Sequence, residues 1–471
     1  MYFSLINFAV WFVIPIEKMG KVSTKYNHNI PDSDKKRIVV IGGGFGGLNL
    51  LKKLKGERFQ VVLLDRYNYH TFQPLLYQVA TAGLEPDSVA GPLRKMIRNR
   101  KGWYFRMLKV SRVDLEKAEV HTAAGPIGYD YLVMGTGSKI NFFNNGSIAE
   151  NSYPLKQVTH SLDLRSTIFH QFERLELMAK HNSTEENLNF VVVGAGPTGV
   201  EICGALAELK RHVLPEDYPE LEISRMQIFL VEGLDRVLPA MSEKSGKRAQ
   251  RYLEKAGIKI LLNCRTESYD GTTVQLSNGE NIASNTMIWA AGVSANLPDG
   301  IPGIYLEKGA VRVNLFNQLI TDDGQPIENV FALGDMAQMA TARYPEGLPG
   351  LAPVAIQQGR HIGRNLNRID AGRPMKPFQY INKGVLATIG RNRAVADLPG
   401  NIKLGGFPGW VVWMGVHLLY LVGFRNKTVV FTNWMWNYMT YDRGIRLIIR
   451  PSPKNRDRFS RAMVDEMHMD K

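Results

Sequence analysis

The stretch "KKRIVVIGGGFGGLNLLKKL", residues 35–54, places five glycines within six positions, between an apolar run and a segment with helical spacing at 47–58. The run "RIVVI" is typical of a strand buried in a parallel sheet. Three of the glycines, Gly42, Gly44 and Gly47, match the pattern G-x-G-x-x-G at a turn from strand to helix. The first allows a tight turn, the second lets a pyrophosphate approach the backbone, and the third allows the helix to pack closely on the strand. The stretch therefore predicts a dinucleotide site at a helix amino end.

An acidic residue at the end of the next predicted strand supports this interpretation. Asp65 closes "QVVLLD", and an acid at that point can hydrogen-bond a ribose 2′-OH. "YDYLVMGTGS" (129–138) is a further buried strand that ends in glycines, and "IENVFALGD" (327–335) is a strand that returns to this first unit. Together these segments predict a complete dinucleotide-binding sheet.

A second copy of the pattern begins at residue 189. "NFVVVGAGPTGVEICGAL" (189–206) contains the glycines Gly194, Gly196 and Gly199, and Glu232 ends the following strand. An acid there favours NADH because it would repel a 2′-phosphate, although Arg236 nearby leaves NADPH open. "NTMIWAAGV" (285–293) mirrors the strand at 129–138, so Gly292 is expected in the nicotinamide site. Two dinucleotide sites in one chain predict a bound flavin and a nicotinamide that reduces it.

The fold class expected from this repeat is α/β, with two Rossmann-like dinucleotide-binding domains and a C-terminal membrane-associating region. The expected boundaries fall into four parts. They are an apolar N-terminal segment and linker at 1–36, an FAD-binding domain at 37–160 and 326–376, an NADH-binding domain at 161–325, and a C-terminal membrane-attachment region at 377–471, to which the family resemblance given below also assigns a quinone site.

The positive charge is concentrated near one end of the chain. The formal net charge is +14, and residues 401–461 carry ten Lys or Arg against two Asp. The same region holds "FPGWVVWMGVHLLYLVGF" (407–424), which has no formal charge, contains one proline and three glycines, and is rich in aromatics. Aromatic and basic residues around a short apolar segment favour a helix lying in a membrane interface on anionic lipid. A dimer interface or a core helix remains the alternative, and the apolar residues 1–16 are either a short anchor or an extended start.

The two cysteines limit the redox chemistry that the sequence can support. Cys203 and Cys264 form no disulfide-type motif and no zinc spacing, and the histidines show no ligand spacing, so no metal site is expected. A dithiol reductase or a sulfide:quinone reductase would need cysteines placed beside the flavin. His417 lies in an apolar run and is expected at an interface or in the core.

At this point the sequence resembles the two-dinucleotide-binding-domain flavoproteins, and more narrowly the type II (non-proton-pumping) NADH:quinone oxidoreductases. The resemblance covers roughly residues 37–450. It is carried by the two glycine turns and by "HTFQPLLYQVATAGL", "NVFALGDMA", "GLAPVAIQQGRHIG", "KGVLATIGR" and the aromatic C-terminal region.

The resemblance implies a set of FAD contacts beyond the first glycine turn and Asp65. Thr136 and Gly137 would line the cofactor, and Gly334 and Asp335 would meet its ribityl chain. Gln78 would lie beside the isoalloxazine, and Ala352 is also expected at the FAD.

The resemblance also implies three catalytic residues. Glu201, two positions after the second glycine turn, resembles a glutamate near both the nicotinamide and the quinone. Gln357 lies in "APVAIQQ", which resembles the A-Q-x-A-x-Q quinone motif, and Lys383 resembles a group beside the isoalloxazine. Pro353 stands where that motif has its first Gln, so that hydrogen bond to a quinone carbonyl is left open.

The expected function is transfer of a hydride from NADH to FAD and then of two electrons to a membrane quinone, without proton pumping. The alternative is a soluble-type NAD(P)H flavin reductase or diaphorase with a protein or other acceptor. The expected partners are a membrane quinone and an anionic lipid surface, with a homodimer allowed and no nucleic acid. The resemblance implies peripheral attachment, through interfacial C-terminal helices, to the cytoplasmic side of the inner membrane.

Overall fold

The apolar run before the first glycine turn forms a central strand of a six-stranded sheet. The computed structural model describes residues 27–55, 58–179, 187–440 and 444–449. The strand order is β22-β23-β9-β1-β2-β5, and all neighbours are parallel except β22 and β23. The strands are β1 (Arg37–Ile41), β2 (Gln60–Asp65), β5 (Trp103–Met107), β9 (Tyr131–Met134), β22 (Gln318–Ile320) and β23 (Pro326–Ala332). β23 pairs with β9, which confirms that the strand predicted at 327–335 returns to the first unit.

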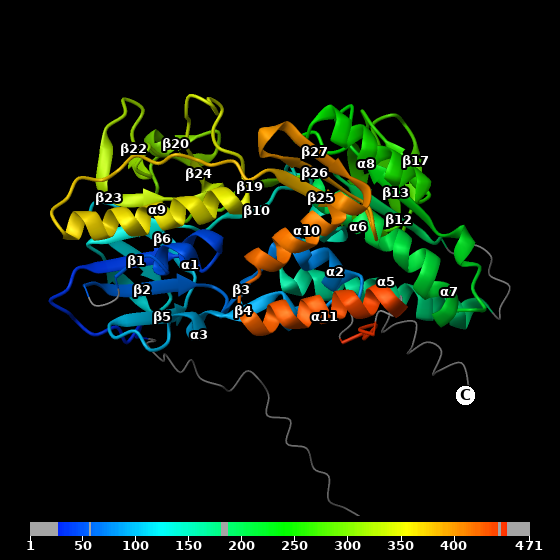
Figure 1. Cartoon of the computed structure of the whole chain (residues 1–471), viewed down its shortest axis with the longest axis horizontal. Helices are drawn as coiled ribbons and strands as arrows, with labels where there is room; N and C mark the ends of the chain where they lie inside the picture. Colours follow the sequence, from blue (N-terminus) through cyan, green and yellow to red (C-terminus); the bar gives the residue numbers. More distant parts are fainter. Residues whose placement is uncertain (1–26, 56–57, 180–186, 441–443, 450–471) are drawn as a thin grey trace, which may run out of the picture.

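A long helix from late in the chain covers this first sheet beside the helix of the glycine turn. α1 (Phe45–Leu51) packs against α9 (Ala352–Asp370), and both are seen along one face of the sheet in Figure 1. α1 is shorter than the helical spacing at 47–58 indicates, and it begins directly after Gly44. The contact is close because Gly359 of α9 lies against the Gly46 backbone.

The second glycine turn belongs to a separate five-stranded parallel sheet with the order β11-β18-β12-β13-β14. Its strands are β11 (Tyr153–Pro154), β12 (Asn189–Val193), β13 (Gln227–Val231), β14 (Ile258–Leu261) and β18 (Thr286–Trp289). α6 (Pro197–Glu208) follows the turn and continues as a π-helical segment, Leu209–Val213. The two Rossmann-like units are thus confirmed. β11 joins the second sheet at Tyr153–Pro154. Later in the chain, Val311 and Val313 already pack in the core of the first sheet, before β22 joins that sheet at Gln318–Ile320.

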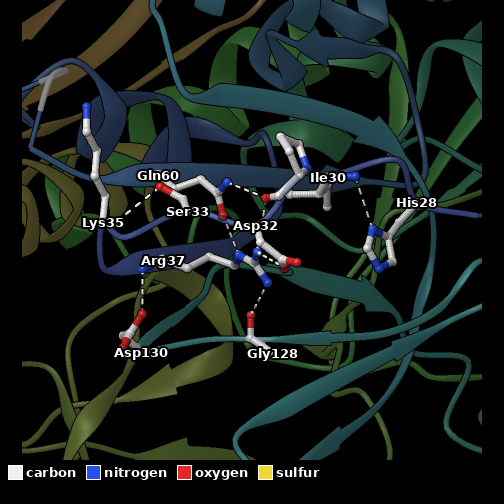
Figure 2. A network of polar contacts seen from close by, with 10 residues as sticks. His28, Ile30, Asp32, Ser33, Lys35, Arg37, Gln60, Gly128 and Asp130 are labelled. Atoms are coloured by element: carbon white, nitrogen blue, oxygen red, sulfur yellow. Dashed lines mark hydrogen bonds and ion pairs between the residues drawn. The ribbon is translucent and has the colours of Figure 1, made fainter.

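The segment preceding β1 crosses the amino ends of the first sheet, opposite the glycine turn. The Arg37 backbone N–H donates to Asp130 Oδ2 over 2.6 Å, and the Arg37 guanidinium donates to Gln60 Oε1 and to the Gly128 carbonyl. Gln60 Nε2 in turn donates to the Pro31 carbonyl over 2.7 Å. Figure 2 shows these side chains and carbonyls converging around the arginine. This network ties β1, β2 and the residues before β9 together at the end of the sheet opposite the first glycine turn.

The C-terminal region forms a small antiparallel sheet followed by two helices. The sheet contains β25 (Val385–Thr388), β26 (Ala394–Leu398) and β27 (Ile402–Gly405). α10 (Gly406–Tyr420) packs on β26, and α11 (Phe424–Thr440) runs along the lower edge of the molecule (Figure 1). Over residues 407–424 the apolar stretch is therefore a helix that stops at Tyr420, a turn, and the start of a second helix.

Each of these two helices has both a buried and an exposed apolar part. Trp413 of α10 and Val430 of α11 are buried in the large core shared with the second sheet. Leu419 and Phe424, at the turn between the helices, are 75% and 86% exposed. Among the described residues, none of the helices has the length and apolar character needed to cross a membrane. Residues 1–16 and 450–471 lie outside the described residues, so the expected N-terminal anchor is not addressed by the structure.

Candidate functional site

The two glycine turns have the same construction. Gly42 has φ +104° and Gly194 has φ +102°, both in the left-handed region that favours glycine. A Cβ on Gly47 would collide with the Gly42 carbonyl, and a Cβ on Gly199 would collide with the Gly194 carbonyl. These four glycines are therefore required by the turn itself.

At the middle glycine of each turn, a side chain would not collide with the surrounding protein. A Cβ on Gly44 or on Gly196 would meet no described atom within 4 Å. The bare backbone at these two positions faces open space at the amino end of α1 or α6. Backbone N–H groups at such an end bind phosphate. Both turns therefore have the shape that a dinucleotide pyrophosphate requires, and the sequence-predicted division of roles among the glycines fits the geometry.

The acid at the end of each following strand lies against its own glycine turn. Asp65 accepts hydrogen bonds from the backbone N–H groups of Gly43 (2.7 Å) and Tyr67 (2.8 Å). Glu232 accepts in the same way from Ala195 (2.6 Å) and Leu234 (3.0 Å). Burial raises the pKa of Asp65, and the hydrogen bonds oppose that shift. A carboxylate has about four acceptor positions, so each acid retains capacity for ribose hydroxyls.

A polar cluster lies between the first glycine turn and the amino end of α9. Ser138 donates to Asp335 Oδ2 over 2.6 Å, and Lys156 Nζ donates to Ser138 Oγ over 2.8 Å. The Gly334 backbone N–H donates to Gln358 Oε1 over 2.8 Å. The sequence-predicted residues Thr136, Gly137, Gly334, Asp335 and Ala352 are thus grouped on adjacent strand ends and at the start of α9.

Three members of this cluster were missed by the sequence interpretation. Ser138 follows directly after "MGTG" and could have been included with it. Lys156 and Gln358 carried no signal, because a lysine after a short strand and a glutamine on a helix are ordinarily solvated. Burial lowers the pKa of Lys156, and the charge of Asp335 opposes that shift.

Glu201 is a buried carboxyl that accepts two hydrogen bonds. It lies on α6, and its Oε1 accepts from the Trp413 indole N–H over 3.2 Å and from the Thr388 backbone N–H over 3.4 Å. Burial raises the pKa of Glu201 to about 8, against the opposing effect of these two hydrogen bonds. At neutral pH this carboxyl is therefore largely protonated, a state in which it can donate a proton.

Tryptophans of α10 and α11 connect Glu201 to a second sequence-predicted residue. The Trp413 and Trp434 rings lie 5.4 Å apart between centroids, and Trp434 donates its indole N–H to Gln78 Oε1 over 2.7 Å. Gln78 lies on α2 (Leu76–Ala80), and its Nε2 donates to the Tyr77 hydroxyl over 2.9 Å. Glu201 and Gln78 thus lie on either side of one aromatic pair.

A cavity opens beside this pair. Gln78, Thr388, Trp413 and Trp434 line it together with residues of α6, its π-helical continuation, α10 and α11. His417 stacks on Trp413 at 4.2 Å between ring centroids, and burial lowers the pKa of His417 to about 4. This histidine is a neutral packing residue, in agreement with its sequence interpretation.

Gln357 and Lys383 are not among the residues that line this cavity. Glu201 does not line it either, but it is hydrogen-bonded to two residues that do, Thr388 and Trp413. The Gln357 amide accepts from the Ile381 backbone N–H over 3.0 Å and donates to the Ile381 carbonyl over 2.9 Å. It therefore holds the segment that leads to Lys383, which is exposed. Pro353 lies in the first turn of α9, where a missing N–H costs no helical hydrogen bond.

The remaining expectations concern Gly292, the cysteines and metals. Gly292 lies just past β18, and its carbonyl accepts a hydrogen bond from the Asn141 backbone N–H over 3.2 Å.

Both cysteines are buried and form no disulfide, and burial raises the pKa of the Cys203 thiol. In the part of the chain that the structure describes, no group of acidic residues, histidines and cysteines could hold a metal ion.

Comparisons with known proteins identify the family of the chain. The family described as pyridine nucleotide-disulphide oxidoreductase matches residues 36–359, and the NDH2 C-terminal domain matches residues 382–441. The chain is 35% identical to the type II NADH:quinone oxidoreductase Ndh of Mycobacterium tuberculosis, over 87% of this chain and 89% of that protein. It is 26% identical to the mitochondrial internal alternative NAD(P)H-ubiquinone oxidoreductase A1 of Arabidopsis thaliana, over 87% and 85% of the two chains.

A solved structure of NDH2 from Plasmodium falciparum in complex with NADH has the same fold. It superposes with a TM-score of 0.78 and 20% identity, covering 88% of this chain and 100% of that one. The chain therefore belongs to the pyridine nucleotide-disulphide oxidoreductases and, within them, to the type II NADH:quinone oxidoreductases.

Proposed function

We propose that this chain is a flavoprotein that oxidises NADH and reduces a membrane quinone without pumping protons. The observation that carries the proposal is the pair of glycine turns in one chain, each with a middle glycine that faces open space. The same chain has a buried protonatable carboxyl, Glu201, whose two hydrogen-bond donors, Thr388 and Trp413, line a cavity. The FAD, when bound, supplies the hydride-accepting and electron-transferring chemistry between NADH and the quinone.

Residues 37–160 and 326–376 form the FAD-binding part in this proposal. Gly44 admits the pyrophosphate, Asp65 meets the adenosine ribose, and Asp335 meets the ribityl chain. Support comes from the polar cluster in which Asp335 is already oriented by Ser138, and Ser138 by Lys156. Gln78 holds the far edge of the site through its bonds to Trp434 and Tyr77.

Residues 161–325 bind NADH in this proposal. Gly196 admits the pyrophosphate, and Glu232 accepts from the ribose hydroxyls. A 2′-phosphate in that position would be repelled by Glu232, which is also held by two backbone N–H groups and cannot easily turn away. Gly292 lies at the neighbouring strand end, where the nicotinamide part would reach.

Glu201 is proposed as the proton donor to the quinone. Quinone reduction consumes two protons with two electrons, and a carboxyl with a pKa of about 8 is protonated in most molecules at neutral pH. The aromatic walls of the neighbouring cavity provide faces on which a quinone ring can stack. Gln357 is proposed to act indirectly, by fixing the segment that carries Lys383.

Residues 377–471 are proposed to attach the protein peripherally to the cytoplasmic side of the inner membrane. Phe407, Leu419, Phe424, Trp436 and Met439 are exposed apolar or aromatic residues on α10 and α11. Such residues beside basic ones favour an interfacial helix on anionic lipid. A homodimer is part of the same proposal, and sedimentation at several protein concentrations tests it.

The alternative, a soluble-type NAD(P)H flavin reductase or diaphorase, gives no reason for so much exposed apolar surface on α11. The experiment that separates the two uses vesicles that contain a long-chain quinone and an entrapped pH-sensitive dye. We expect NADH oxidation to require the embedded quinone and to leave the internal pH unchanged. If NADH is oxidised equally fast by vesicles with and without the quinone, the diaphorase is favoured. Acidification of the vesicle interior would contradict the absence of proton pumping.

A further inference from the structure

A second cavity lies at the turn between α10 and α11, and it shares no lining residue with the cavity beside Glu201. Its walls come from four parts of the chain: α1 with Lys52 after it, His70 of β3 (Tyr69–Thr71), α9, and the segment Leu419–Phe424 with the first turns of α11. The last of these includes the most exposed apolar residues of the turn. This cavity therefore opens on the surface that is proposed to meet the membrane.

Three cations converge on this cavity. Lys52 follows α1, Arg360 lies on α9, and Lys427 lies on α11. Burial, together with the charges of Arg360 and Lys427, lowers the pKa of the Lys52 ammonium. The residues that line the cavity, all of them in the described part of the chain, include no carboxylate. Such a concentration of positive charge is compensated when an anion binds.

The neighbouring contacts hold these cations without neutralising them. Arg360 Nε donates to Asn49 Oδ1 over 3.0 Å, and Lys427 Nζ donates to the Leu419 carbonyl over 3.0 Å. Both partners are uncharged. In contrast, Arg425, which lies on α11 with Lys427, forms a salt bridge with Asp87. Within the described ranges, no salt bridge is formed by Lys52, Arg360 or Lys427.

The inner end of the cavity is uncharged. His70 is 3% exposed, and its Nδ1 lies 3.1 Å from the Gly43 carbonyl, so Nδ1 carries the hydrogen and Nε2 is an acceptor. Nε2 has no hydrogen-bond partner among the described residues. Phe45, Leu48 and Ile356 complete this end. The cavity thus suits a molecule with one anionic end and an uncharged remainder that can offer a hydroxyl.

We propose that this cavity binds the phosphodiester headgroup of an anionic membrane lipid, with the phosphate between Lys52, Arg360 and Lys427. The exposed Leu419 and Phe424 beside the cations place a lipid, rather than dissolved phosphate, at this mouth. The proposal rests on the membrane attachment proposed above and adds its specific contact point. Bound lipid would connect the FAD-binding part to α11, because the three cations come from both.

Lysine footprinting on the intact flavoprotein tests the proposal directly. The protein is treated with an amine-acetylating reagent alone, with zwitterionic phosphatidylcholine vesicles, with vesicles containing phosphatidylglycerol, or with inorganic phosphate. Acetylation of each lysine is followed by mass spectrometry. We expect phosphatidylglycerol vesicles to slow acetylation of Lys52 and Lys427 several-fold. The control is Lys255 on α8 (Glu243–Lys255), at the upper edge of the molecule far from α11 (Figure 1), which should be unaffected.

Three results would overturn the proposal: unchanged Lys52 acetylation in protein that has sedimented with the vesicles, equal protection by phosphatidylcholine vesicles, or equal protection by inorganic phosphate. A matched pair of variants gives a second measurement. Lys52→Gln should weaken binding to phosphatidylglycerol vesicles roughly fivefold, whereas Lys255→Gln should not. Electron transfer from NADH to a water-soluble quinone should be unchanged in both variants. If the wild-type protein itself transfers no electrons from NADH to the water-soluble quinone, the proposed function is contradicted, but the lipid site is not.

Discussion

Trp413 donates its indole N–H to the carboxyl of Glu201 over 3.2 Å, although 212 residues separate them in the chain. Glu201 lies on the helix that follows the second glycine turn, and Trp413 lies on the first helix of the C-terminal region. The region proposed to contact lipid is therefore bonded directly to the carboxyl proposed to supply a proton. Both residues are buried, so the bond is shielded from water.

Glu201→Gln should slow quinone reduction by roughly 100-fold or more, because a glutamine cannot donate a proton. In the wild-type protein, the rate of quinone reduction should fall as the pH rises through about 8, since the protonated form is then lost. In the variant this fall should be absent. Single-turnover reoxidation of the NADH-reduced protein at a series of pH values measures both effects. An unchanged rate and profile in the variant would remove Glu201 from the proton path.

The same carboxyl should make stability depend on pH. Its folded-state pKa is raised, so the native protein binds a proton that the unfolded chain releases above about pH 4.5. The contribution of Glu201 to stability is therefore greatest at low pH and is lost as the pH rises through about 8. Glu201→Gln should melt at a higher temperature than wild type at pH 9, by a smaller margin at pH 6, and close to wild type near pH 4.5. The reverse order at pH 9 would contradict a raised pKa.

Trp413→Phe should move the pH profile of quinone reduction to higher pH. The indole N–H stabilises the ionised carboxylate, so its removal raises the pKa of Glu201 further. A hydrogen bond to a charged group contributes roughly 1.5–3 kcal/mol, which corresponds to about one pH unit or more. Trp434→Phe is the matched control, because Trp434 bonds to Gln78 and not to Glu201. Equal shifts in the two variants would mean that aromatic packing, not the hydrogen bond, sets the pKa.

Substitutions within the first glycine turn should separate folding from cofactor binding. Gly42→Ala should destabilise the protein by roughly 1–3 kcal/mol or more, because φ is +104° and a Cβ would collide with the Gly135 carbonyl. Gly44→Ala should leave the melting temperature of the apoprotein unchanged but reduce the FAD content after purification. Flavin absorbance and apoprotein melting measure the two properties. Full FAD content in Gly44→Ala would show that no phosphate approaches there.

Glu232→Arg should shift the preference from NADH towards NADPH, because it exchanges repulsion of a 2′-phosphate for attraction. We expect a change of roughly tenfold or more in the ratio of kcat/KM for the two nucleotides, as one removed and one added charge contact would each contribute. Steady-state rates with each nucleotide measure this ratio. The same ratio in both proteins would mean that the nucleotide ribose lies elsewhere.

Membrane attachment is best tested by point substitutions at the turn between α10 and α11. Deleting residues 407–471 would also remove Trp413 from the core, so it would damage more than the attachment surface. Leu419→Glu with Phe424→Glu should release the protein from vesicles, since each side chain contributes roughly 1.5–3 kcal/mol when buried in an apolar phase. Leu234→Glu, an exposed apolar residue of the second domain, is the control. Undiminished vesicle binding in the double variant would direct attention to residues 1–16.

The glycine turns and both sheets could be predicted because their signals are local. A glycine pattern, an apolar strand and an acid at fixed spacing specify the βαβ geometry around Gly42 and Gly194 whatever the rest of the chain does. The contacts of Lys156 with Ser138 and of Trp413 with Glu201 could not be predicted in this way. They join residues from different elements, and each side chain taken alone is ordinary for an exposed loop or an apolar helix.

For Gln357 the sequence motif suggests a partner that differs from the one in the structure. Its motif directs attention to a quinone, whereas the structure engages both ends of its amide with the Ile381 backbone. The motif identifies the right helix but cannot show which partner the amide has. The grouping of Lys52, Arg360 and Lys427 around the second cavity could not be predicted from the sequence either. Lys52 follows α1, whereas Arg360 lies on α9 and Lys427 on α11, so only the fold brings them together.

Double-mixing anaerobic stopped-flow tests the central claim most directly, because it follows the flavin through both halves of the reaction. The purified protein is mixed first with NADH and then with a quinone, while flavin absorbance is recorded. The account predicts bleaching on the first mixing and full recovery of the oxidised spectrum on the second. A protein that binds flavin but shows no bleaching with NADH, or bleaches and is not reoxidised by quinone, would contradict it.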